Sequence, residues 1–314
     1  MKWRILIACP QLQQTIDGYR DLFAERGIEI ELPHLVQQLS ESELLEIIDR
    51  FDGVIAGDDE FTARVLEKGT RLKVIARWGV GVDAVDLDAA KRLGIRVSNT
   101  PDVFADEVAD IVMGYIILLA RQLHKLDRSV RSGGWMKIQG ISLRGKTLGV
   151  IGVGSIGRAV VQRAAVAGMS AVGYDIAPVP TSFMMETGLR LVELEDLLQT
   201  SDFISLNCNM NPANRHMLGP CEFAAMKTGV YIVNTARGPL IDEAALVQAL
   251  REGKVAGAAL DVFEDEPLPL DSPLRQFDNC IFGTHNSSNT YEAVMRVNER
   301  TIRKLLDGLE SDTP

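Results

Sequence analysis

TLGVIGVGSIGRAVVQRAAVAGMSAVGYD, residues 147–175, decides the fold of this chain. The first five residues are apolar and partly β-branched, which is typical of a buried parallel strand. Three glycines follow at once: Gly152, Gly154 and Gly157. A helix is predicted next from the apolar spacing of Ile156, Val160, Ala164 and Ala167, with Gly168 at its C-cap. A second short strand then ends in Asp175.

This order of strand, glycine turn, helix, strand and acid is typical of a dinucleotide-binding unit. Gly152 would make the tight turn, Gly154 would let a pyrophosphate approach the backbone, and Gly157 would let helix and strand pack closely. The helix N-terminus offers N–H groups and a positive dipole to the phosphates. Asp175 would bind a ribose diol and repel a 2′-phosphate, which favours NAD over NADP. The alternative is a glycine-rich turn in an α/β protein that binds no nucleotide.

Composition narrows the class of protein. A length of 314 residues suggests two domains, and 46% hydrophobic with 24% charged residues is ordinary for a globular chain. The net charge of −10 argues against nucleic acid and anionic membranes as partners. An anionic substrate stays possible, because a local arginine can dominate a cleft.

The remaining whole-chain features predict a cytoplasmic protein. Cys9, Cys208, Cys221 and Cys280 show neither a CxxC pattern nor zinc spacing, so we expect free thiols and no metal. The apolar start at residues 5–8 breaks at Pro10 and predicts a strand, not a secretory signal. The longest apolar run, residues 111–120, is too short to span a bilayer.

The rest of the chain alternates between strand and helix patterns. Strands are predicted at residues 4–8, 28–32, 54–56, 72–76 and 95–97, then at 203–206, 230–233, 256–260 and 280–282. Helices are predicted at 12–26, 40–50, 87–93, 103–121, 194–199, 243–251 and 291–309. Such alternation predicts parallel sheets with helices on both faces. Because a complete α/β unit precedes the dinucleotide stretch, we expect two α/β units, with the last helix returning to the first.

Several side chains at predicted strand ends could act on a 2-oxo acid. Arg237 follows a strand in Asn234-Thr-Ala-Arg-Gly238, and its guanidinium suits a carboxylate; the alternative is a surface ion pair. His285 also follows a strand and could exchange a proton near neutral pH; the alternative is a structural histidine. Glu266 could orient it, with Glu264 and Asp265 as competing acids. The other histidines, His34, His124 and His216, are expected at the surface.

Together these residues resemble the D-isomer-specific 2-hydroxyacid dehydrogenase family, in particular its phosphoglycerate-dehydrogenase-like branch. The similar stretches are Gly79–Asp86, Gly145–Gly157, Asn234–Gly238, Gly257–Pro267 and the loop at His285. The resemblance implies an α/β fold of two doubly wound parallel-sheet domains, a Rossmann NAD-binding domain inserted in a flavodoxin-like substrate domain. The implied boundaries are residues 1–100 plus 286–314 for the substrate domain and 101–285 for the NAD-binding domain.

The resemblance also implies the site and its partners. Arg237 would bind the substrate carboxylate, and His285 paired with Glu266 would donate the proton when NADH reduces a small 2-oxo acid to a D-2-hydroxy acid. Backbone N–H groups of Gly79, Val80 and Gly81 would bind the substrate. Besides the three glycines, the implied cofactor contacts are Val80, Ser155, Ile156, Asp175, Cys208, Thr235 and Asp261. Hinge closure and a homodimer built on the NAD-binding domain are implied as well.

Departures from the pattern leave alternatives open. Phosphoglycerate dehydrogenases often carry an arginine after the third strand, where this chain has Gly57-Asp-Asp-Glu60, and three acids would repel a phosphate. Asn209 replaces a usual proline, and Asn286-Ser-Ser288 replaces a glycine-rich triplet. The leading function is therefore a D-2-hydroxyacid dehydrogenase acting on a small acid. D-3-phosphoglycerate dehydrogenase is one alternative, and a non-catalytic NAD-sensing protein is another.

Overall fold

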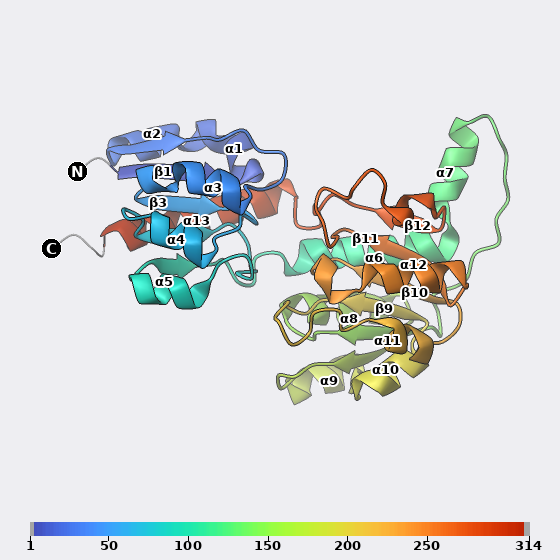
Figure 1. Ribbon diagram of the computed structural model, residues 1–314. Coiled ribbons are helices and arrows are strands. Elements are labelled where there is room, and N and C mark those ends of the chain that lie inside the picture. The colour runs from blue at the N-terminus through green and yellow to red at the C-terminus, as the bar shows by residue number, and fades with distance from the viewer. Residues whose placement is uncertain (1–2, 311–314) are drawn as a thin grey trace. The chain divides into compact units, whose positions relative to one another are not determined.

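The computed structural model describes residues 3–310, which form two compact α/β units (Figure 1). One unit contains the chain up to Val103 and again from Asn289 onward, and the other contains Phe104–Ser288. Each predicted domain boundary lies three residues before the corresponding crossing between units. We call them the N-terminal unit and the inserted unit.

The N-terminal unit is built on a five-stranded parallel sheet in the order β2-β1-β3-β4-β5, the flavodoxin-like order. The strands are β1 (Trp3–Ala8), β2 (Ile28–Glu31), β3 (Gly53–Ala56), β4 (Val74–Arg77) and β5 (Arg96–Ser98). All residues of β3 and β4 are buried, as expected for strands covered on both faces. The predicted parallel sheet of this unit is confirmed.

Helices cover this sheet, and one of them comes from the far end of the chain. They are α1 (Pro10–Thr15), α2 (Arg20–Glu25), α3 (Glu41–Ile47), α4 (Ala63–Lys68), α5 (Leu87–Leu93) and α13 (Tyr291–Glu310). Helix α13 packs on β3 and β4 at close range, since a Cβ added to Gly308 would lie 2.6 Å from a methyl carbon of Val74. The predicted helix 12–26 is instead two short helices joined by a 3-10 turn at Ile16–Tyr19, where Gly18 weakens the helix.

The inserted unit has a seven-stranded parallel sheet in the order β12-β11-β10-β9-β6-β7-β8. Its strands are β6 (Thr147–Ile151), β7 (Ser170–Tyr174), β8 (Arg190–Leu191), β9 (Phe203–Leu206), β10 (Val230–Asn234), β11 (Val255–Leu260) and β12 (Cys280–Phe282). From β6 the chain builds outward through β7 and β8 on one side and through β9 to β12 on the other. Its strand order reverses between β6 and β9, which defines a doubly wound Rossmann sheet and confirms the predicted fold class.

The helices of this unit are α6 (Ala105–Arg121), α7 (Leu123–Arg131), α8 (Ser155–Val166), α9 (Thr181–Thr187), α10 (Leu194–Thr200), α11 (Pro220–Ala225) and α12 (Glu243–Arg251). Helix α6 packs against α8 and the sheet, which explains its apolar sequence. Helix α7 was not predicted. None of its residues is buried, and apolar side chains such as Leu123 and Val130 are exposed. Figure 1 shows α7 and the loop after it projecting away from the sheet of this unit. Within residues 3–310, no helix combines the length and apolarity needed to cross a membrane.

Candidate active site

Most of the predicted site residues follow the carboxyl ends of the inserted unit's strands. Parallel strands end at one edge of the sheet, and ligands bind there where the strand order reverses. Gly152 and Asp175 follow β6 and β7 on one side of that reversal. Arg237, Glu266 and His285 come after the adjacent strands β10, β11 and β12 on the other. The sheet therefore brings the predicted cofactor and catalytic segments to one edge.

The glycine turn after β6 has the geometry that the sequence predicts. Gly152 adopts a left-handed φ of +87°, and an added Cβ would lie 2.6 Å from the backbone nitrogen of Cys208. A Cβ on Gly157 would overlap the carbonyl oxygen of Gly152. At Gly154, by contrast, no heavy atom lies within 4 Å of an added Cβ. Two glycines thus allow close packing, and the third leaves open space beside the first turn of α8.

The first turn of α8 suits an anionic group. Gly154 is the N-cap of α8 and has no side chain. The N–H groups in the first turn of the helix therefore donate no hydrogen bond to an N-cap side chain and are available to a ligand. Ser155 and Ile156 begin the helix. Backbone N–H groups and the positive end of a 12-residue helix favour a phosphate here.

Asp175 bridges the end of β7 and the glycine turn. Its Oδ2 accepts a hydrogen bond from the backbone N–H of Val153 at 2.6 Å, and its Oδ1 accepts one from Ala177 at 2.7 Å. A carboxylate has further lone pairs, so these bonds orient it without using its full capacity to accept ribose hydroxyls.

The loop after β10 is held by its own asparagine. Asn234 is buried; its Nδ2 donates to the carbonyl oxygen of Arg237 at 2.9 Å, and its Oδ1 accepts from the N–H of Ala236 at 3.0 Å. Arg237 is half-buried, and its Nη1 donates to the carbonyl oxygen of Ala236 at 2.9 Å. In the same loop, Thr235 Oγ1 is buried without a hydrogen-bond partner among the described residues. An orphaned hydroxyl of this kind fits a contact to a bound ligand.

Gly238 couples this loop to the one after β11. A Cβ at this position would overlap the carbonyl group of Phe263, so only glycine allows the two backbones to approach this closely. The contact fixes Arg237 relative to the segment that carries Glu266.

His285 and Glu266 form the predicted pair. His285 Nδ1 lies 2.8 Å from Glu266 Oε2, and the other carboxylate oxygen accepts from the N–H of Phe263 at 3.0 Å. Their side chains are only 22% and 15% exposed, which limits competition from water. His285 has a φ of +52°, a left-handed conformation that is unfavourable for a residue with a Cβ. Such strain is often found at functional positions.

The competing acid Glu264 has a structural role. It accepts a hydrogen bond from the N–H of Glu243 at 3.1 Å, and Glu243 accepts one from the N–H of Glu264 at 2.8 Å. Burial, followed by repulsion from the neighbouring carboxylates, raises the pKa of Glu243. His216, expected at the surface, is half-exposed and lies 3.0 Å from Glu264 through its Nε2. These contacts separate Glu264 from the pair formed by Glu266.

Asp261, a predicted cofactor contact, lies almost completely buried directly after β11. Its Oδ2 accepts hydrogen bonds from the N–H of Ser287, at 2.8 Å, and from the Ser287 hydroxyl. The hydroxyl of Tyr115 on α6 lies beside the same carboxylate, because a Cβ added to Gly283 would approach both groups. Sequence reasoning assigned no role to Tyr115, which lies in an apolar helix, or to Ser287, which was noted only as part of Asn286-Ser-Ser288.

Cys208, another predicted cofactor contact, follows β9 beside Gly152. Burial raises the pKa of its thiol to about 11, so the group is a neutral thiol near pH 7. All four cysteines are free thiols, and no cluster of metal-ligating side chains occurs among residues 3–310.

The predicted substrate loop lies in the N-terminal unit, after β4. Gly79 has a φ of +138°, and its N–H donates to Thr100 Oγ1 at 3.1 Å. Asn99 Nδ2 donates to the carbonyl oxygen of Val80 at 2.6 Å. The N–H of Gly79 thus already donates a hydrogen bond within the N-terminal unit. The N–H groups of Val80 and Gly81 are the remaining predicted donors of this loop to a substrate carboxylate.

The acidic loop after β3 differs from its sequence interpretation. Asp59 is completely buried and accepts from the N–H groups of Leu39 and Gly57, at 2.7 and 2.8 Å. Glu60 accepts from the N–H of Glu41 at 2.9 Å, at the start of α3. Asp58 pairs with the buried Arg77 at the end of β4. The loop therefore presents the exposed Glu60 and the paired Asp58, while Asp59 is buried.

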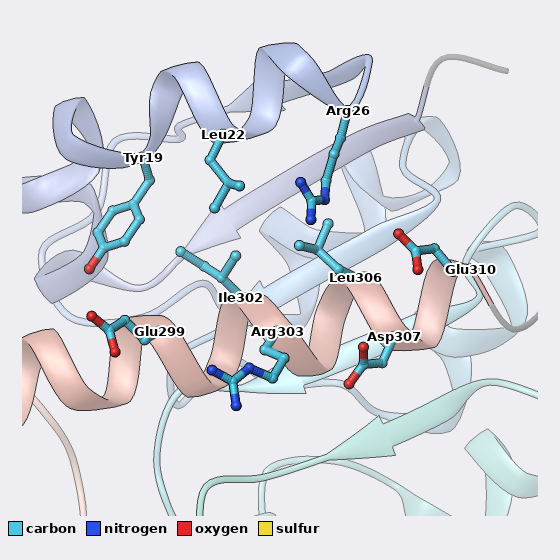
Figure 2. A pocket seen from close by; sticks show the side chains of 9 residues that line it. All are labelled: Tyr19, Leu22, Arg26, Glu299, Ile302, Arg303, Leu306, Asp307 and Glu310. Carbon is cyan, nitrogen blue, oxygen red and sulfur yellow. The ribbon is translucent and has the colours of Figure 1, made fainter.

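A hollow of about 290 Å³ lies elsewhere in the N-terminal unit, between α13 and the segment from Tyr19 to Arg26 (Figure 2). Figure 2 shows Leu22 facing Ile302 and Leu306, with charged side chains around them. None of the predicted site residues lines it. The hollow lies where helices pack together, and both acidic and basic side chains surround it.

The inserted unit has a Rossmann sheet with a dinucleotide turn where the strand order reverses. A histidine–glutamate pair lies at the same edge of the sheet. These two features together define the class of NAD-dependent dehydrogenases. Comparison with known proteins narrows this class. The sequence profile described as "D-isomer specific 2-hydroxyacid dehydrogenase, NAD binding domain" matches residues 113–287. The chain belongs to this family of NAD-dependent oxidoreductases, which act on a CH–OH group.

Individual relatives carry different names. A D-3-phosphoglycerate dehydrogenase of Methanocaldococcus jannaschii is 45% identical over 81% of this chain but only 49% of its own length. A hydroxypyruvate reductase of Thermotoga maritima is 40% identical over 89% of this chain and 92% of its own. The structure of Aquifex aeolicus D-lactate dehydrogenase complexed with NAD and lactic acid superposes with a TM-score of 0.88 at 28% identity, covering 98% and 96% of the two chains.

Proposed function

We propose that this protein catalyses reversible hydride transfer between NAD(H) and a small 2-oxo or 2-hydroxy acid. The observation that carries the proposal is the half-buried pair of His285 and Glu266, 2.8 Å apart, at the edge that holds the dinucleotide turn. A carboxylate on Nδ1 fixes the tautomer of the ring and stabilises its charged form. Nε2 of His285 then exchanges the proton with the oxygen of the substrate.

Arg237 is the proposed carboxylate-binding residue. Its guanidinium can bind a carboxylate through two parallel N–H bonds and, beside the carbonyl, draws electron density toward the oxygen. Bound NADH supplies the hydride to the carbonyl carbon. The amides of Val80 and Gly81 are proposed to bind the same carboxylate, and the two units form the substrate and NAD-binding domains respectively.

The proposed cofactor contacts follow from the inserted unit. Gly152, Gly154 and Gly157 shape the turn, and the amides of Ser155 and Ile156 bind the pyrophosphate. Asp175 accepts from the ribose hydroxyls, while Thr235 Oγ1, Asp261 and Cys208 line the remaining site together with Val80. The orphaned hydroxyl of Thr235 and the open space at Gly154 support this arrangement.

The substrate is proposed to be a small acid such as glyoxylate or hydroxypyruvate. A substrate with a phosphate would need a second cation in the loop region after β3. Arg77 lies there, but Asp58 neutralises its charge. D-3-phosphoglycerate remains the alternative substrate, supported by the 45% identity to the M. jannaschii enzyme, by the burial of Asp59 and by the pairing of Asp58 with Arg77.

A homodimer and a cytoplasmic location complete the proposal. Helix α7 has no buried residue. Apolar side chains of α6, of α7 and of the loop after α7 are exposed, among them Ile117, Leu123, Val130 and Trp135. We infer that these side chains form one apolar surface, which would be typical of a subunit interface. Four free thiols support a reducing compartment.

The test is a panel of 2-oxo acids, including phosphohydroxypyruvate, assayed with NADH and with NADPH. We expect turnover with NADH and at least one small acid. His285→Gln should lower kcat about 10²-fold or more while NADH binding is kept, since general acid catalysis is worth that much. His124→Gln, a histidine of the same unit bound only to the Asp278 carbonyl oxygen through Nε2, is the control. Tight NAD binding with no turnover on any acid would instead favour an NAD sensor.

A further inference from the structure

A buried carboxylate, Asp261, holds the loop that presents His285. Asp261 is 2% exposed and lies directly after β11, while the His285 loop follows the neighbouring strand β12. An ionised carboxylate at this depth must be satisfied by hydrogen bonds. Its hydrogen-bond partners here are the N–H and hydroxyl groups of Ser287, and the hydroxyl of Tyr115 lies beside it.

The bonds of Asp261 bracket the histidine. The N–H of His285 donates to the backbone carbonyl oxygen of Asp261 at 2.7 Å, and the N–H of Ser287, two residues later, donates to the side-chain Oδ2 at 2.8 Å. Between these two anchors His285 keeps its left-handed φ of +52°. A strained conformation persists only where its surroundings over-determine it, and these bonds do so.

Tyr115 supports the carboxylate from a different element. It lies on α6, far from Asp261 in sequence, and burial together with the charge of Asp261 raises the pKa of its phenol. Gly283, at the end of β12, makes room for the contact. A Cβ at Gly283 would overlap Asp261 Oδ1 and lie 2.5 Å from the Tyr115 hydroxyl.

We propose that Tyr115 and Ser287 are positioning residues, which act through the Asp261 carboxylate to hold the His285 imidazole against Glu266. The inference rests on the proposed function of His285 and extends it to two side chains that touch neither the reacting atoms nor the glycine turn. Ser287 is central, because its hydroxyl adds a second bond to the one that any residue's N–H would make at this position.

The positioning role has a kinetic signature. If the hydroxyls only hold the histidine loop, their loss should weaken proton transfer more than it weakens binding. Ser287→Ala and Tyr115→Phe are each expected to lower kcat about tenfold, which corresponds to about 1.4 kcal/mol of transition-state stabilisation. The KM of the 2-oxo acid and the dissociation constant of NADH should stay within about twofold. Because both variants act on one carboxylate, their effects should not add.

Matched controls remove the same groups elsewhere in the inserted unit. Ser201→Ala deletes a buried hydroxyl that donates to the Leu197 carbonyl oxygen at the C-terminal end of α10. Tyr231→Phe deletes a half-buried phenol on β10, whose ring stacks on Phe203. Both controls should retain wild-type kcat. An equal loss in the controls, or a rise in KM and in the NADH dissociation constant that accounts for the whole loss, would overturn the proposal.

A second measurement keeps the test independent of turnover. The Nδ1 proton of His285, bonded to Glu266, should give a slowly exchanging downfield proton resonance in the NMR spectrum, assigned by its loss in Glu266→Gln. We expect this resonance to broaden in Ser287→Ala and Tyr115→Phe and to persist in the two controls. If wild-type protein reduces no acid, the proposed function fails, and this resonance still decides the positioning role. An unchanged resonance in both variants would refute it.

Discussion

Single side chains at this site carry more than one task. Asp175 was predicted from its place after the second strand of the dinucleotide unit, and it also accepts the N–H of Val153 in the glycine turn. Its carboxylate therefore shapes the turn as well as the ribose site. Such double use is invisible in the sequence, because it depends on how the turn folds back toward β7.

The cofactor preference of Asp175 can be measured directly. Asp175→Ser removes the charge that would repel a 2′-phosphate, so we expect the ratio of kcat/KM for NADH over NADPH to fall about tenfold or more. Both cofactors should also bind more weakly, since Val153 loses its partner. Glu186→Ser, which removes an exposed acid of α9, is the control. An unaltered NADH/NADPH ratio would contradict the ribose assignment.

Asp59 links the pH to the stability of the N-terminal unit. Burial raises the pKa of its carboxyl from 3.8 to about 7. Between these values the folded state binds more protons than the unfolded state, so the free energy of unfolding falls as pH rises from about 4 to about 7. The loss contributed by this group is at most about 1.4 kcal/mol per pH unit.

Chemical denaturation at several pH values tests this linkage. Over this interval the stability of wild-type protein should decrease more steeply with pH than that of Asp59→Asn, which has no proton to lose. The variant keeps one of the two bonds to Leu39 and Gly57 through its amide oxygen, so it serves for comparing slopes and not absolute stabilities. Parallel slopes in the two proteins would rule out Asp59 as the titrating group.

At the scale of elements, the spacing of apolar residues predicted the strands and helices that pack against a core. Strands β6 and β7 and helix α8 were found because their apolar residues face a core. Helix α7 was not predicted, because none of its residues is buried. The break between α1 and α2 was not predicted either, because the spacing of apolar residues does not locate a 3-10 turn. Likewise, Arg237, Glu266 and His285 follow strand ends, whereas Tyr115 and Ser287 become informative only when α6 and β12 are placed beside β11.

The glycine turn allows two of its members to be tested against each other. Gly154→Ala adds a methyl group where no heavy atom lies within 4 Å, so folding should be unaffected while NADH affinity falls about tenfold or more. Gly157→Ala places a methyl group on the carbonyl oxygen of Gly152, and this overpacking should cost about 1–3 kcal/mol of stability. Thermal unfolding and NADH fluorescence titration measure the two effects. Equal destabilisation by both substitutions would show that Gly154 serves folding alone.

At the scale of the whole molecule, the exposed apolar side chains of α6 and α7 concern assembly. Leu123 and Val130 lie on α7, 39% and 55% exposed. Replacing both with glutamate should convert the proposed dimer to a monomer, because a charge buried without a partner opposes association. Sedimentation velocity reports the change. Leu270→Glu, at a loop residue that is 91% exposed, should leave the assembly intact. A wild-type monomer, or a dimer that survives the double substitution, would exclude this surface.

The insertion of one unit within the other has a consequence for synthesis on the ribosome. Strands β3 and β4 are made early, but helix α13, which covers them, follows the whole of the inserted unit. At about 5–20 residues per second, translation of Phe104–Ser288 takes about ten seconds or more. During that interval the nascent N-terminal sheet lacks the helix that covers β3 and β4, while the inserted unit is still being synthesised. The unit whose strands are made first is therefore the last to finish folding.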